Sequence, residues 1–156
     1  MSIEVSFWIK GKTGVYLCED ELEWYIAELK GVDDLPGYIT IASETHHIEL
    51  TDDLDYIIPE LCFSSIPNLS NNLPFHITRA SASGSYELWA DQTQVWISGP
   101  NITATAFEKR GFLAALFQCG LRFLEFLRKL DGNTGQYEGT IDQLESEQIA
   151  AKEFIN

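Results

Sequence analysis

The chain has 156 residues, of which 45% are hydrophobic and 22% are charged. This length and composition fit one domain spanning residues 1–156, and they exclude collagen-like, low-complexity and wholly disordered chains. The formal net charge of −14 disfavours any role that depends on neutralising phosphates, so we expect no nucleic acid and no membrane surface as partner.

Four short segments before residue 51 predict β-strands, chiefly because apolar and polar residues alternate along them with a period of two. They are residues 3–9, 15–18, 38–42 and 48–50. Between the second and the third, Leu22, Ile26 and Leu29 lie on one stripe and predict a helix near 20–30.

The next segment combines helix and loop signals. Apolar residues at helical spacing predict a helix near 52–63, with Thr51 as its cap and a kink or break at Pro59. The run 64–74 is rich in Ser, Asn and Pro, and we expect it to form a loop.

Residues 73–107 carry a β pattern that two turn-like segments interrupt. If both turns close symmetrically, Trp89 lies opposite Trp96, and Trp96 lies opposite Thr103. The aliphatic residues then form a row on the other face. This agreement between the two faces favours a three-stranded meander.

The C-terminal part of the chain is predicted to be helical. A helix over 107–130 is apolar around most of its circumference and should be largely buried. A last helix is expected near 140–153. We therefore predict an α+β fold: an antiparallel sheet of about five to seven strands with the helix at about 107–130 packed on one face. The shorter helices are expected near 20–30, 52–63 and 140–153.

The N-terminal residues lack the basic and apolar regions of a signal peptide, so we expect a cytoplasmic location. The three cysteines, Cys18, Cys62 and Cys119, are an odd number in apolar surroundings. We expect reduced core cysteines rather than a disulfide framework.

No catalytic or metal-binding motif is complete. Gly11-Lys12-Thr13 matches the end of a phosphate-binding loop, but Ser6 stands where the pattern needs a glycine. His46 and His47 are adjacent and would point to opposite faces of a strand, so they are poorly placed to share a metal ion. We expect no catalytic residue, no metal site and no cofactor.

The acidic residues are unevenly distributed. Residues 1–60 contain 14 acids and 3 bases, whereas residues 107–130 contain 2 acids and 5 bases. A concentrated negative surface steers association with a basic partner, and tryptophans are enriched at interface hot spots. The predicted partner-binding residues are Glu19, Asp20, Glu21, Glu23, Glu28, Asp52, Asp53, Asp55, Glu60, Trp89 and Trp96.

These features favour a non-enzymatic protein that binds a basic protein. In size, charge and inferred class, the chain resembles the small acidic immunity proteins of bacterial toxin–immunity systems. The resemblance implies that the protein binds and neutralises a basic toxin such as a nuclease by covering the active site of the toxin. It rests on no shared motif, so it assigns no functional residue to this chain.

Two alternatives stay open. One is a small-ligand-binding enzyme or accessory subunit with a pocket between the sheet and residues 51–67, which His46, His47 or His76 would line. The other is a structural subunit that oligomerises through its tryptophan-bearing face. The sequence does not determine the oligomeric state.

Overall fold

Two antiparallel sheets of four strands and a set of helices make up the computed structural model, which describes residues 2–32 and 34–155. The predicted α+β class is confirmed, with the strands divided between two sheets. The first sheet has the order β2-β1-β3-β4 and contains β1 (Glu4–Lys10), β2 (Tyr16–Cys18), β3 (Pro36–Ala42) and β4 (His47–Asp53). The second has the order β5-β6-β7-β8 and contains β5 (Phe75–Thr78), β6 (Ser85–Ala90), β7 (Gln94–Gly99) and β8 (Ile102–Glu108).

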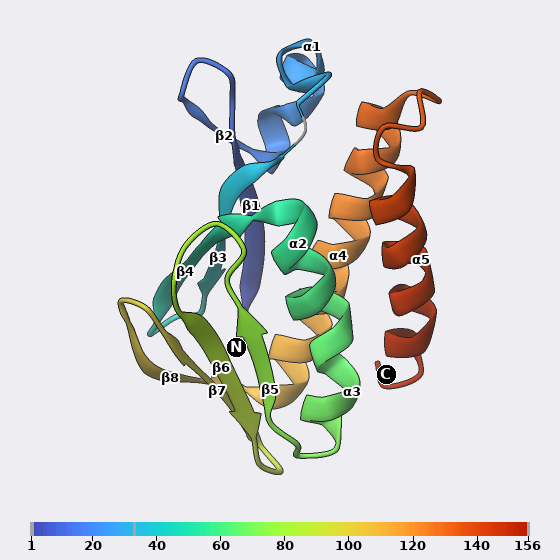
Figure 1. The fold of residues 1–156 in the computed structure, drawn as a ribbon. Helices are drawn as coiled ribbons and strands as arrows, with labels where there is room; N and C mark the ends of the chain where they lie inside the picture. The colour runs from blue at the N-terminus through green and yellow to red at the C-terminus, as the bar shows by residue number, and fades with distance from the viewer. Residues whose placement is uncertain (1, 33, 156) are drawn as a thin grey trace.

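The longer helices gather on one side of the two sheets (Figure 1). Near one end of the first sheet lie a 3-10 helix, η1 (Glu19–Tyr25), and a short α1 (Ile26–Leu29). A second helical run comprises α2 (Leu54–Ile58), the π-helical η2 (Pro59–Ser64) and α3 (Ser65–Ser70). The C-terminal pair, α4 (Lys109–Asp131) and α5 (Glu138–Lys152), packs against η2. None of the described helices is long and apolar enough to cross a bilayer.

The long helix predicted at 107–130 is confirmed as α4, which begins at Lys109 because Phe107 and Glu108 complete β8. The Glu108 carboxylate accepts hydrogen bonds from the first N–H groups of the helix and so caps it. The helix ends where Gly132 adopts a left-handed conformation, with φ of 52°. Its buried apolar residues are Phe112, Leu113, Leu116, Phe117, Cys119, Phe123, Leu124, Phe126, Leu127 and Leu130.

α4 and η2 lie close together at Gly120. A Cβ atom on this glycine would lie 2.6 Å from the Phe63 ring and 3.1 Å from the Cβ atom of Cys62. The absent side chain is therefore what allows the two helices to touch. Cys62 and Cys119 are free and fully buried beside this contact.

The segment between residues 51 and 74 differs from the prediction in three ways. Thr51 does not cap a helix, since it belongs to β4 and α2 starts only at Leu54. The helical run is not broken at Pro59, but it changes there from the α-helix α2 to the π-helix η2. The predicted loop at 64–74 is wrong over its first half, which forms α3.

The second sheet confirms one predicted strand register and corrects another. Trp89 pairs with Trp96 across β6 and β7, as predicted. Trp96 pairs with Ala106 and not with Thr103. There are two reasons. Gly99 pairs with Ile102, so the turn is formed by the two residues after Gly99 and not by Gly99 and Pro100, and a register shift between Ile97 and Gly99 adds one more residue.

The two sheets join at the free edge of β4. Asp52 is 1% exposed, and its Oδ1 atom accepts hydrogen bonds from Ser81 N at 2.8 Å and from Ala80 N at 3.1 Å. The Tyr86 hydroxyl accepts a hydrogen bond from Thr51 N at 3.0 Å. These contacts hold the strands and loop of the second sheet against the last strand of the first.

Candidate partner-binding surface

The predicted acidic stretch at 19–28 lies on η1 and α1, next to α4, and two of its acids are neutralised there. Arg122 Nε donates to Glu19 Oε1 at 2.5 Å. Lys129 Nζ donates to Glu23 Oε1 at 3.0 Å. Part of the charge asymmetry in the sequence is thus an internal pairing between an acidic segment and a basic helix.

The Arg122–Glu19 pair also covers the part of β1 that β2 does not reach. Arg122 Nη2 donates to the Val5 carbonyl at 2.6 Å, and Glu19 Oε2 accepts the Phe7 N–H at 3.2 Å. An unpaired strand edge is a template for pairing with another chain, and here two side chains occupy its hydrogen-bonding groups.

The remaining acids of this stretch have separate surroundings. Asp20 is exposed, and Glu28 is half-buried. Glu21 Oε1 accepts a hydrogen bond from Cys18 Sγ at 2.9 Å, and this contact raises the pKa of the thiol. The structure therefore does not gather the five acids of 19–28 into one unpaired patch.

The second predicted stretch contains a cluster of acids that no Lys or Arg among the described residues neutralises by a salt bridge. Burial raises the pKa of Asp53, and the charges of Asp34, Asp55 and Asp52 raise it further. Burial also raises the pKa of Asp55; hydrogen bonds from backbone N–H groups oppose this, while the charges of Asp34 and Asp52 add to it. Negative charges are thus held together where β3 begins and α2 follows β4.

A second pair of acids lies between η2 and α5. Glu60 is half-buried; its burial and the charge of Glu147 raise its pKa. The Oε2 atom of Glu147 is buried and has no hydrogen-bond partner among the described residues. Buried carboxylate oxygens normally have a hydrogen-bond partner. The cluster around Asp53 and Asp55 and the pair of Glu60 and Glu147 therefore both cost folding free energy.

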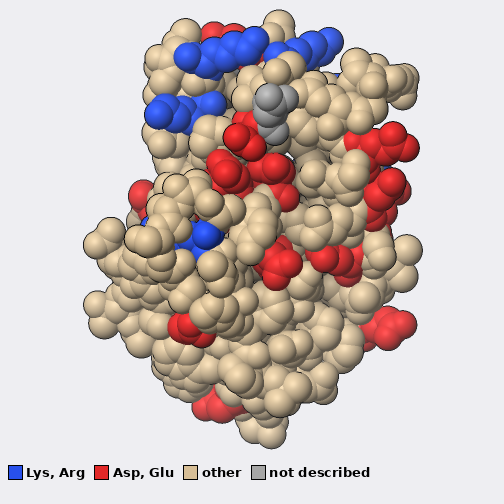
Figure 2. Space-filling view, in the orientation of Figure 1, with Lys and Arg blue, Asp and Glu red and all other residues tan. Residues whose placement is uncertain are grey.

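Asp34, Asp53, Asp55, Glu60 and Glu147 are named the acidic face from here on. Figure 2 shows Asp and Glu side chains near the start of α2 and along α5; of the Lys and Arg side chains that this view shows, most lie at the upper edge and one lies in the middle left. Within residues 2–32 and 34–155, none of the five forms a salt bridge with Lys or Arg.

The two predicted tryptophans lie on the second sheet and contact each other. Their ring centroids are 6.3 Å apart, and the ring planes differ by 6°. Trp89 is 37% exposed, and Trp96 is half-buried. Both side chains are on the face of the sheet opposite the buried Leu88 and Ile97, so this face is open. The acidic face, by contrast, is built from the first sheet and the helices.

The three histidines lie in three different places. His46 packs against Phe107, with ring centroids 6.2 Å apart. His47 borders a small polar hollow at the β4 edge. His76 Nδ1 lies 2.5 Å from Glu87 Oε1 on the open face of the second sheet. In the described parts of the chain, no three His, Cys, Asp or Glu side chains are placed to hold a metal ion.

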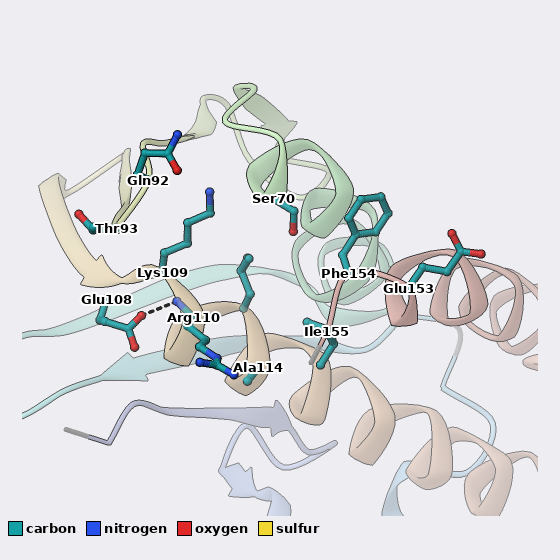
Figure 3. A pocket seen from close by; sticks show the side chains of 11 residues that line it. Ser70, Gln92, Thr93, Glu108, Lys109, Arg110, Ala114, Glu153, Phe154 and Ile155 are labelled. Atoms are coloured by element: carbon teal, nitrogen blue, oxygen red, sulfur yellow. Dashed lines mark hydrogen bonds between the residues drawn. The ribbon is translucent and has the colours of Figure 1, made fainter.

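A hollow of about 830 Å³ opens at the start of α4, between the β6–β7 turn and the C-terminal residues (Figure 3). Lys109 Nζ reaches across it and donates to Asn72 Oδ1 at 2.6 Å and to the Asp91 carbonyl at 2.9 Å. Phe154 and Ile155 form its opposite wall. This hollow is not the pocket beside residues 51–67 that the enzyme alternative predicted.

Sequence reasoning missed Asp34 and Glu147 as members of the acidic face. Neither has a motif around it, and each meets its partners only because distant segments come together in the fold. For Asp34, the sequence does offer one signal: the acidic residue lies two positions before the strand that pairs with β4.

Comparisons with protein-family models, with curated proteins and with solved structures found no match to this chain.

Proposed function

We propose that this protein binds a basic protein partner through its acidic face, without catalysis. An immunity protein that blocks a basic toxin such as a nuclease would act in this way. The observation that carries the proposal is the raised pKa of three members of the face, Asp53, Asp55 and Glu60.

Burial is the main cause of each raised pKa, and the charges of neighbouring acids add to it, so the folded chain holds these carboxylates partly desolvated and close to like charges that repel them. An internal basic residue would relieve this repulsion, as Arg122 does for Glu19. No Lys or Arg in the described part of the chain does so for the acidic face. A basic partner would supply the missing charge and would be steered toward this face.

The test is a pull-down from lysate of the source organism at about 50 mM and about 300 mM salt, because screening weakens charge steering between these concentrations. Three baits are compared: the wild type, the triple variant Asp53→Asn, Asp55→Asn and Glu60→Gln, and a matched control. The control, Glu44→Gln, Asp142→Asn and Glu153→Gln, removes the same number of charges at exposed positions elsewhere.

We expect the wild type and the control to retain one basic protein in stoichiometric amount, more weakly at the higher salt concentration. The triple variant of the acidic face should associate with this basic protein about tenfold more slowly than the wild type does. The captured protein is then assayed for nuclease activity with and without the bait. Retention of no basic protein at either salt concentration would overturn the proposal, as would equal losses in the two triple variants.

A further inference from the structure

The outer face of the first sheet carries a row of aromatic rings. Trp8 and Tyr38 pair across β1 and β3, and their rings stack with centroids 5.6 Å apart and planes 13° apart. Tyr16 on β2 packs against Tyr38 at 5.1 Å and is 41% exposed. The alternate residues of these strands form the buried core, so the rings face away from it.

Two carboxylates flank the central ring of this row. Tyr38 pairs with Thr51 of β4, so Glu49 and Asp53 are its diagonal neighbours on that strand; on β1, which pairs Trp8 with Tyr38, the diagonal neighbours are Ser6 and Lys10. Diagonal positions in an antiparallel pair are about 7 to 8 Å apart, within reach of long side chains. Burial raises the pKa of Tyr38, and the negative charge of Glu49 raises it further.

The second sheet carries a similar stacked pair of rings with different neighbours beside Trp89. The diagonal neighbours of Trp89 on β7 are Gln94 and Ser98, which are neutral. The Glu87 carboxylate on this face already contacts His76, with Oε1 of Glu87 lying 2.5 Å from Nδ1 of His76. A stack of two rings alone therefore does not distinguish the faces, whereas the two flanking carboxylates do.

We infer that the outer face of the first sheet binds arginine side chains of the basic partner, which stack on Trp8 and Tyr38 and pair with Glu49 and Asp53. A guanidinium group is planar, stacks on aromatic rings and offers several donors to a carboxylate, whereas an ammonium group does not stack. The inference rests on the proposed function, and it specifies the partner's side-chain chemistry. Asp53 belongs to both surfaces, so the aromatic row continues directly into the acidic face.

The probes are three amidated peptides of equal length, in which glycine alternates with arginine, lysine or glutamate. Binding to the full chain is measured by fluorescence anisotropy of labelled peptides at about 50 mM salt, at which exposed charges are weakly screened. The indole N–H resonances of Trp8, Trp89 and Trp96 report which rings the peptide meets. Tyr38→Val removes the central ring and keeps a good strand former, and Trp89→Val is the matched control on the second sheet.

We expect the arginine peptide to bind about threefold to tenfold more tightly than the lysine peptide, because both make a cation–π contact but only the planar guanidinium stacks on the ring and offers several donors to a carboxylate. The Trp8 resonance should shift, while those of Trp89 and Trp96 stay in place. Tyr38→Val should abolish the preference for arginine, and Trp89→Val should leave it unchanged. The shift of Trp8 in the wild type supports the site even if Tyr38→Val fails to fold.

Equal affinity for the arginine and lysine peptides would overturn the inference, and so would shifts at Trp89 and Trp96 in place of Trp8. Absence of peptide binding would also overturn it. If the pull-down nevertheless retains a basic protein through the acidic face, only the arginine site is rejected. If the pull-down fails as well, the proposed function is rejected with it.

Discussion

Asp52 and Asp53 are neighbours in the chain but have different surroundings. Asp52 points inward and accepts hydrogen bonds from Ala80 and Ser81, so it holds the two sheets together. Asp53 points outward into a cluster of like charges. This difference follows from strand alternation, since successive residues of β4 face opposite sides of the sheet. Tests of partner binding should therefore change Asp53 and leave Asp52 intact.

Replacing Asp53 by Asn should stabilise the fold at pH 7. The raised pKa of Asp53 means that the folded state binds a proton more readily than the unfolded state. Its destabilising effect is complete above the folded-state pKa and disappears as the pH falls below the unfolded value. We expect Asp53→Asn to increase the free energy of unfolding by up to about 0.5 kcal/mol at pH 7. At pH 3 the gain should be absent. Urea denaturation at the two pH values measures this.

Asp91 provides the control of opposite sign. Hydrogen bonds from the backbone N–H groups of Thr93 and Gln94 lower its pKa. The folded state therefore favours the charged form, and removing the charge by Asp91→Asn should give no stabilisation at pH 7. A stabilisation as large as that of Asp53→Asn would contradict the electrostatic account of both residues.

At the scale of elements, the contact between α4 and η2 at Gly120 depends on the absence of a side chain. Gly120→Ala would place a methyl group 2.6 Å from Phe63, so we expect it to reduce the free energy of unfolding by about 1 to 3 kcal/mol. Gly139 is also helical, in α5, but a Cβ atom there would meet nothing within 4 Å. Gly139→Ala should stabilise the protein by about 0.5 kcal/mol. Urea denaturation of both variants checks this, because the free energy of unfolding should fall for Gly120→Ala and rise for Gly139→Ala. Equal changes in the two variants would refute the packing argument.

Local sequence patterns predict the elements of this fold better than they predict how the elements meet. The apolar period of α4 and the Trp89–Trp96 pair are local signals, and both are confirmed. The predicted Trp96–Thr103 pair is wrong because alternation alone fixes neither the position of the turn after Gly99 nor the register shift near it. The sequence also could not show which acidic stretch is neutralised within the fold. Arg122 neutralises Glu19 in the first stretch, and these two residues are 103 positions apart in the chain.

At the scale of the whole molecule, one core connects the two sheets. The buried apolar residues form a single cluster that includes strands of both sheets and α4. α4 packs on β1 of the first sheet and on β7 and β8 of the second. The contacts of Asp52 and Tyr86 add a polar connection at the sheet junction. Neither sheet could lose its packing without exposing apolar surface of the other.

The protein should therefore unfold in one cooperative transition. Trp8 reports on the first sheet and Trp96 on the second, so their indole N–H signals can be followed in one urea titration of the wild type. Because both signals come from the same sample, no substitution disturbs the comparison. We expect the native signals to disappear with the same midpoint, since α4 and the shared core must be lost together. An earlier loss of Trp96 would instead mean that the second sheet opens as a separate unit, and the single-domain assignment would then be wrong.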